Sequence, residues 1–405
     1  MLRPYVPRLA TIGSRRWIAT LAAMTAVTAL SIDMSLPAQP TIANAFDVPG
    51  STAQLTLSLF LVGFAGAQLV TGYLSDALGR RRVLLSGLAL FAATGVLCAL
   101  SPTIELLLVA RVLQGIGAAA GPVVARAMVR DTHPGSSAAH LLSTMLAALA
   151  LAPMVAPFLG GLLLDIASWR AIFIALAICG CALLALATFT LTETHPPERR
   201  VTHGIVRNFV AFLRTPGTRF PMFVSCATFA GQFAYISDSP FVLIDGYGVA
   251  PDHFGFYFGS TALALMVGSL GGGAMLRAGR SPRTMLRLGT SLLLAGGVLV
   301  VAGTRLDLGL PGFFVPMLIY FLGVGLTSPS ATALAMEPVP HLAGTASAAI
   351  GSLQMLCGAL SGYLTTKLGG SSPRLFALVV LVMSALAAVL ALGAARNRPI
   401  LTRVS

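Results

Sequence analysis

The stretch Gly72-Tyr-Leu-Ser-Asp76-Ala-Leu-Gly79-Arg80-Arg81-Arg82 interrupts a long apolar region of the chain. Apolar residues fill 52–74 before the charged break and 83–101 after it. Each run is long enough for an α-helix to cross a hydrocarbon layer, which takes roughly 20 residues. The break therefore predicts a short turn at a membrane surface that joins two transmembrane helices.

The same alternation of apolar runs and short polar breaks continues along the 405 residues. Hydrophobic residues make up 56% of the chain and charged residues 10%, which a water-facing surface does not tolerate. Open sheets cannot satisfy their backbone in lipid, so we predict helices. The predicted spans are 17–38, 52–74, 83–101, 104–127, 139–164, 169–192, 220–243, 254–276, 284–303, 309–334, 343–366 and 374–395. The fold class expected is an all-α membrane protein with twelve transmembrane helices.

The net charge of +13 comes from short arginine clusters between the apolar runs. Such clusters are topology signals rather than a basic stripe, so we expect no nucleic acid as partner. With twelve helices, most arginines fall on one side, and the positive-inside rule makes that side cytoplasmic. We therefore expect a multi-pass protein of the bacterial inner membrane with both termini in the cytoplasm. The cysteines and histidines show no metal-ligand spacing, and we expect no metal.

The longest polar interruption covers 193–219 and separates two sets of six predicted helices. We interpret it as a cytoplasmic linker between an N-terminal bundle, 1–192, and a C-terminal bundle, 220–405; an ordinary loop is the alternative. The recurrence of several residues at matching positions in the two halves favours two six-helix pseudo-repeats. The residues that recur are the pairs Gly72 and Gly272, Gly79 and Gly279, and Arg80 and Arg280.

Four residues of the opening stretch suggest a gating motif. Gly72 allows two helices to approach closely, and Gly79 suits a tight turn. Asp76 and Arg80 can form charge-assisted hydrogen bonds that hold one conformation and release another. The alternative is that the arginines only set topology.

This stretch resembles the signature between helices two and three of the major facilitator superfamily. The helix-four motif of that superfamily resembles Leu108–Gly117, and its helix-five antiporter motif resembles Ala152–Gly161. Three further segments resemble the Bcr/CflA branch, namely Asp33–Pro40, Ala125–Asp131 and Tyr235–Val242. The resemblance implies a drug:proton antiporter, because that branch exports chloramphenicol-like, bicyclomycin-like and other compounds.

Two ionisable residues fall inside predicted spans, Asp33 in the first and Arg111 in the fourth. Asp33 is placed about five residues before the outer end of its span, at a depth similar to that of Arg111. Charges inside the membrane are costly and usually face a partner or a water-filled cavity. We expect both to face a central cavity, and the resemblance implies that they couple transport to protons. A static pair joining two helices is the alternative.

In the fifth predicted span, Pro153 and Pro157 remove backbone donors and are expected to bend the helix. Gly160 and Gly161 would permit close contact with the opposite half of the protein. Together these residues suggest a hinge or a seal against leak. The alternative is an ordinary proline kink of a membrane helix.

The candidate substrate residues are Gln114, Tyr235, Asp238, Tyr257 and Met355. All of them except Asp238 could instead simply pack. Asp238 departs from the resembling family, which often has a small uncharged residue there. It is either an acid that attracts cations at the cavity mouth or a solvated cap. The second half has Leu276 and Ile319 where Asp76 and Arg111 would repeat, so proton chemistry is expected mainly in the first half.

The function expected is proton-coupled export of drug-like small molecules, driven by the proton gradient without a cofactor. The alternative is a metabolite transporter, including an uptake symporter. We expect no enzyme, because no cluster of His, Asp or Glu lies at a predicted membrane interface. The partners expected are the drug-like substrate, protons and the lipid bilayer, with the protein as a monomer.

Overall fold

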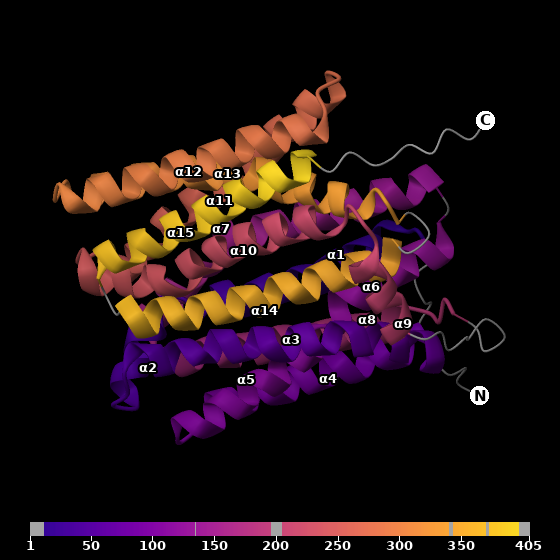
Figure 1. The fold of residues 1–405 in the computed structure, drawn as a ribbon. Coiled ribbons are helices and arrows are strands. Elements are labelled where there is room, and N and C mark those ends of the chain that lie inside the picture. The colour runs from indigo at the N-terminus through magenta and orange to yellow at the C-terminus, as the bar shows by residue number, and fades with distance from the viewer. Residues whose placement is uncertain (1–11, 134, 196–204, 340–342, 370–371, 397–405) are drawn as a thin grey trace, which may run out of the picture. The chain divides into compact units, whose positions relative to one another are not determined.

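The computed structural model describes residues 12–133, 135–195, 205–339, 343–369 and 372–396 (Figure 1). Every regular element in these ranges is helical. The helices of the first half are α1 (Arg15–Asp33), α2 (Gln39–Ala45), α3 (Gly50–Leu78), α4 (Arg80–Ala99), α5 (Ile104–Ala118), α6 (Ala120–Thr132), α7 (Gly135–Ile166) and α8 (Trp169–Thr190). The short helix α2 is a feature that apolar runs did not predict, because its seven residues are too few to span a membrane.

The second half begins with a short helix and continues with six long ones. Its elements are α9 (Ile205–Arg214), α10 (Arg219–Pro240), the π-helical turn η2 (Phe241–Gly246), α11 (Pro251–Arg277), α12 (Pro282–Arg305), α13 (Gly309–Met336), α14 (Ala343–Gly369) and α15 (Pro373–Arg396). Within the described ranges, eight helices are long and apolar enough to cross a membrane, and α5 with α6 counts as one of them. The observed ends lie within a few residues of the predicted spans.

Local sequence explains where several helices begin. The hydroxyl groups of Ser14, Thr103 and Ser281 accept hydrogen bonds from backbone N–H groups three residues later. These caps satisfy donors that have no partner within the helix. Pro251 and Pro282 each occupy a first helical position, where a missing N–H costs nothing. Helix boundaries are therefore encoded by residues just outside the apolar runs.

The chain divides into two compact units by its internal contacts. Unit 1 consists of Met1–Ser35 and Leu59–His203, and unit 2 of Leu36–Ser58 and Gly204–Ser405. The sequence-based bundle boundaries assigned all of 1–192 to the first bundle. The structure instead groups Leu36–Ser58 with unit 2, so the single helix α3 contributes to both units.

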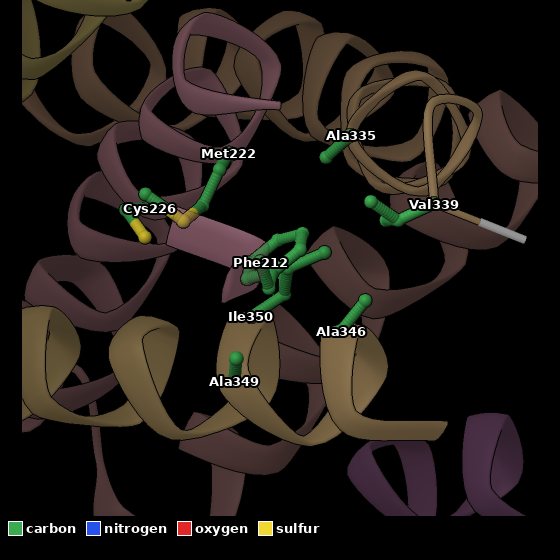
Figure 2. Packing of buried hydrophobic residues seen from close by; sticks show 8 residues of the cluster. All are labelled: Phe212, Met222, Cys226, Ala335, Val339, Ala346, Ala349 and Ile350. Atoms are coloured by element: carbon green, nitrogen blue, oxygen red, sulfur yellow. The ribbon is translucent and has the colours of Figure 1, made fainter. Parts of the chain in front are cut away.

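Helix α9 lies inside the predicted linker and anchors its second part to unit 2. Figure 2 shows Phe212 of α9 at the centre of a buried apolar cluster. The residues around it come from α10, α13, α14 and the turn after α13, and they are Met222, Cys226, Ala335, Val339, Ala346, Ala349 and Ile350. Because Phe212 is fully buried, the second part of the linker is a packed element rather than a free loop. Residues 196–204 of the linker lie outside the described ranges.

Candidate functional site

Arg111 lies in the middle of α5, and its side chain is completely buried. The guanidinium donates to Oε1 of Gln114 at 2.7 Å and to the backbone carbonyl of Ser31 at 3.3 Å. Its Cζ lies 4.5 Å from the ring centroid of Phe60 and 5.5 Å from that of Phe173. Ring faces attract cations, so two acceptors and two rings stabilise a charge that burial would otherwise oppose.

Gln114 acts as the polar partner of Arg111 within α5. The two residues are three positions apart, which places their side chains on one helix face. Oε1 of Gln114 also lies 3.9 Å from the Cys98 thiol, which donates to it. Its Nε2 is buried and has no hydrogen-bond partner among the described residues.

A second contact joins α1 to α5, because the Thr28 hydroxyl donates to the carbonyl of Ala118 at 3.4 Å.

Asp33 is the last residue of α1 and is 4% exposed. The predicted span continued about five residues beyond Asp33, whereas the observed helix ends at Asp33 and the chain turns at Met34. The contact described between Arg111 and α1 is made by the backbone carbonyl of Ser31. The ion pairs among the described residues use other acids, namely Asp76, Asp131, Asp252 and Asp307. Pairing of Asp33 with Arg111 stays a prediction.

Arg80 connects three elements at the turn between α3 and α4. Its side chain is 8% exposed, and its guanidinium contacts the Asp76 carboxylate one helical turn earlier. Its Nε donates to Asp131 of α6 at 2.9 Å, and its Nη1 donates to the Ser75 hydroxyl at 2.7 Å. Charge-assisted bonds of this kind are stronger than neutral ones, particularly when the donor is buried. Arg80 therefore holds α3 and α6 together within unit 1.

Glu193, which follows α8, caps the start of α4, and Arg81 of α4 caps the end of α8. The Glu193 carboxylate accepts from the backbone N–H groups of Arg80 at 2.9 Å and Arg81 at 3.2 Å, at the start of α4. Arg81 in turn donates to the carbonyls of Leu191 at 2.8 Å and Thr188 at 2.9 Å, at the end of α8. An anion at a helix N-terminus and a cation at a helix C-terminus both interact favourably with the helix dipole. The pair thus fastens α4 to α8.

Gly79 supports this arrangement through its backbone, which has φ of 103°. This positive φ is unfavourable for residues with a Cβ atom, so the tight turn requires glycine. The repeat-related Gly279 also has positive φ, at 84°. Arg280 is nevertheless exposed where Arg80 is buried. The turn geometry recurs in the second half, but the charged cluster does not, since Leu276 replaces the acid.

The residues of the helix-five motif lie in a continuous helix. Pro153 and Pro157 both fall inside α7, with Pro157 buried and Pro153 half-buried. Gly160 and Gly161 are buried as well. Helix α7 packs against α1 within unit 1, so it adjoins the helix that carries Asp33. The proposed roles in sealing and bending stay predictions.

Tyr235 of α10 lies in the aromatic core of unit 2. Its ring stacks on Phe258 with centroids 6.0 Å apart and meets Phe321 edge-on at 5.0 Å and Phe376 at 6.2 Å. Aromatic packing of this kind contributes stability beyond the buried area. The residue is completely buried, and its hydroxyl has no hydrogen-bond partner within the described part of the chain. Tyr235 therefore packs inside unit 2 in this conformation.

The other candidate substrate residues of unit 2 differ in exposure. Tyr257 is half-buried and meets Phe314 edge-on at 5.0 Å, and Met355 of α14 is half-buried. Asp238, in contrast, is completely buried near the end of α10. The alternative of a solvated cap for Asp238 is therefore wrong for this conformation, because no part of its side chain reaches solvent.

Two residues of the Arg80 cluster were not among the predicted site residues. Asp131 occurred in a segment quoted for its family resemblance, and Glu193 marked only the start of the linker. Both residues bind Arg80, which precedes Asp131 by 51 positions and Glu193 by 113 positions in the sequence. Neither the helical period nor motif spacing reports such distant contacts. The one sequence feature that could have pointed to Asp131 and Glu193 is their position as acidic residues just after an apolar run.

The arrangement described above is typical of a membrane transporter: long apolar helices, ionisable groups buried inside them, and a charged cluster at helix ends. The sequence profile of the Major Facilitator Superfamily matches residues 21–362. The chain therefore belongs to the Major Facilitator Superfamily. The prediction of an all-α membrane protein with twelve transmembrane helices in the fold of that superfamily is confirmed.

Three curated relatives are similar over most of their length. An uncharacterized MFS-type transporter YdgK of Bacillus subtilis is 38% identical over 82% of this chain and 83% of its own. A bicyclomycin resistance protein homolog of Haemophilus influenzae is 32% identical, over 92% and 94%. A chloramphenicol resistance protein of Pseudomonas aeruginosa is 32% identical, over 90% and 86%. Among solved structures, a bacterial homolog of the human lysosomal transporter Spinster has TM-score 0.74 at 16% identity, covering 95% of this chain and 98% of that one.

Proposed function

We propose that this protein exports drug-like small molecules across the bacterial inner membrane in exchange for protons. The relatives named for bicyclomycin and chloramphenicol resistance support drug efflux. The observation that carries the proton coupling is the pair of buried ionisable residues in membrane helices of unit 1, Asp33 and Arg111. Charges at such positions are expensive and mark pathways for ions or protons.

Asp33 is the proton carrier in this proposal. Its carboxyl takes up a proton when its surroundings open to the outside, and loses it when they open to the cytoplasm. Arg111 remains charged throughout and sets the local field, held by Gln114, the carbonyl of Ser31 and two phenyl rings. Inward proton flow then drives the outward movement of substrate, with each step permitted by alternating access.

The first test identifies the substrate and its direction together. The gene is expressed in an efflux-deficient bacterium, which is screened against a drug panel that includes chloramphenicol and bicyclomycin. We expect raised resistance to at least one compound, and accumulation of that compound in inverted vesicles upon acidification of their interior. Accumulation by right-side-out vesicles instead would support the alternative, an uptake symporter.

The second test concerns the proton. In Asp33→Asn the side chain keeps its shape but cannot exchange a proton at physiological pH, so we expect loss of uphill transport with substrate binding retained. The measurements are pH-gradient-driven transport in inverted vesicles and substrate binding to the purified variant. The exposed Asp165 of α7 offers a control, because Asp165→Asn should transport as the wild type does. Intact proton-driven transport in Asp33→Asn would overturn the coupling.

The orientation and assembly belong to the same proposal. In this proposal both termini lie in the cytoplasm, which the arginine clusters support through the positive-inside rule, and the transporter works as a monomer without a cofactor. Reporter fusions at the C-terminus that fluoresce only in the cytoplasm test the orientation.

A further inference from the structure

A second buried acid lies in unit 2, outside the Asp33 and Arg111 region of unit 1. Asp238 of α10 is completely buried, and neither carboxylate oxygen has a hydrogen-bond partner among the described residues. The adjacent Ser237 hydroxyl is buried and lacks a partner within the same ranges. The Thr366 hydroxyl of α14 interacts with the carboxyl, but its own hydrogen bond goes to the carbonyl of Gly362 at 3.1 Å.

These groups belong to a polar node at which three helices meet within unit 2. Beside Gly362 of α14 lie the Ser237 hydroxyl and the Gln54 amide of α3, so close that a Cβ atom at Gly362 would collide with both. The Gln54 amide also donates to the Ser58 hydroxyl at 3.0 Å. Ser58 in turn donates to the carbonyl of Ala359 on α14 at 2.7 Å. The Ser58 hydrogen bond thus fastens the first part of α3 to α14, and Ser237 of α10 lies beside the same glycine.

The surroundings of Asp238 offer no compensating charge. Elements that pack against α10 are α13, α14, α15 and η2, and α11 adds Phe258 beside Tyr235. The titratable and charged groups on these elements and on α10 itself are Arg219, Cys226, Tyr235, Asp245, Asp252, His253, Tyr257, Arg277, Tyr320, Cys357, Tyr363, Lys367, Arg374 and Arg396. Helix α3 carries no charged residue between Gly50 and Ser58.

The cations among these groups are engaged elsewhere or lie far along their helices. Lys367 lies over the Tyr363 ring at 5.5 Å, and Arg374 pairs with Asp307 at 2.7 Å. Arg219 begins α10, whereas Asp238 lies near its end. An ionised carboxylate buried without a partner costs far more than a protonated one, so such a group is stable only when neutral.

We propose that Asp238 is a second proton-binding residue and that its bound proton keeps the node of α3, α10 and α14 closed. A proton is the ligand that fits, because the side chain is fully enclosed and leaves no surface for a cationic substrate in this conformation. Loss of the proton creates a buried charge that must be hydrated, and hydration separates the groups packed beside Gly362 and breaks the hydrogen bond from Ser58 to the Ala359 carbonyl. A role of Asp238 in transport rests on the proposed function, which is proton-coupled export. The binding of a proton by Asp238 does not depend on that proposal.

The direct test requires no substrate. Infrared difference spectra of the full-length protein in lipid, recorded between acid and alkaline pH, report carboxyls that exchange a proton. We expect a protonated-carboxyl band that persists in Asp33→Asn and disappears in Asp238→Asn. A band that is unchanged in Asp238→Asn overturns the proposal. Asp238→Glu keeps a titratable carboxyl and should restore a shifted band, so a misfolded Asn variant does not decide the outcome.

The effect on the node is tested by labelling a cysteine at position 58, in a background without the native cysteines. The reagent is a water-soluble maleimide, and the comparison is Ser58→Cys with and without Asp238→Asn. The quantity compared is the labelling rate with Asp238 intact divided by the rate in the Asp238→Asn variant. This ratio cancels the intrinsic pH dependence of the thiol, which is the same in both proteins. We expect a ratio near one at acid pH that rises several-fold at alkaline pH. A ratio that stays constant overturns the coupling between Asp238 and the node. Neither test uses a drug. Both results can therefore be interpreted even if the efflux proposal fails.

Discussion

At the scale of single residues, the chemistry of this chain depends on buried groups whose stabilisation differs. Arg111 is surrounded by acceptors and phenyl rings, and Arg80 by carboxylates. Asp238 has neither. A charge with partners is retained in the protein interior, whereas an acid without them binds a proton. The two kinds of residue therefore suit different tasks, with Arg111 as a fixed charge and Asp238 as an exchangeable one.

The geometry around Arg111 predicts that lysine cannot replace it. Arg111→Lys keeps the charge but loses the planar fork that reaches both Gln114 and the Ser31 carbonyl. Loss of one hydrogen bond to a charged group costs about 1.5–3 kcal/mol, which corresponds to roughly 10- to 150-fold in transport rate. The measurement is initial efflux of the compound that the drug panel identifies, normalised to membrane expression. Wild-type transport by Arg111→Lys would show that charge alone suffices.

At the scale of elements, helix ends carry as much specific chemistry as helix faces. The turn between α3 and α4 brings together Asp76, Gly79 and Arg80, and the start of α4 is capped by an acid that follows α8. Backbone groups at helix ends have no partner within the helix and need one elsewhere. In a membrane protein, these ends are where polar residues are affordable. The cluster therefore forms at the ends of α3, α4, α6 and α8.

The reciprocal caps of Arg81 and Glu193 predict a coupled loss of stability. Glu193→Ala removes an acceptor from two N–H groups of α4, and loss of an N-terminal cap costs about 0.5–2 kcal/mol. Arg81→Ala uncovers two carbonyls of α8. Both changes loosen the same junction, so we expect the double variant to be less destabilised than the sum of the single ones.

The readout for this junction is the thermal unfolding of the purified variants in detergent. Glu193→Gln keeps an acceptor oxygen and should lie between Glu193→Ala and the wild type. Asp165→Ala, at an exposed acid of α7, serves as the matched control and should unfold as the wild type does. Strict additivity of the two alanine variants would show that the caps act independently.

At the scale of the whole molecule, the unequal division of α3 is the feature with the clearest consequence. This continuous helix of 29 residues belongs to unit 2 up to Ser58 and to unit 1 from Leu59. Alternating access requires one unit to move against the other. Since an uninterrupted helix resists bending, the first part of α3 is expected to leave unit 2 during the transport cycle.

Cross-linking the first part of α3 to α14 is therefore expected to arrest transport. The positions are 58 and 359, because the Ser58 hydroxyl already donates to the carbonyl of Ala359 at 2.7 Å. In Ser58→Cys/Ala359→Cys, without the native cysteines, a short bifunctional maleimide should abolish vesicle transport. Each single-cysteine variant treated with the same reagent is the control. Full transport in the cross-linked protein would mean that α3 bends instead of detaching.

The order and approximate bounds of the long membrane helices could be predicted from local sequence, because crossing a hydrocarbon layer imposes a length and an apolar composition that can be recognised locally. Local sequence also located the turn at Gly79 and the contact between Asp76 and Arg80, which are separated by less than two helical turns. The contacts between groups far apart in sequence became visible only in the packed fold: Arg80 with Asp131 and Glu193, Arg111 with Ser31, and Gln54 and Ser58 with α14. These contacts depend on how helices pack, and the helical period specifies a face without specifying its partner.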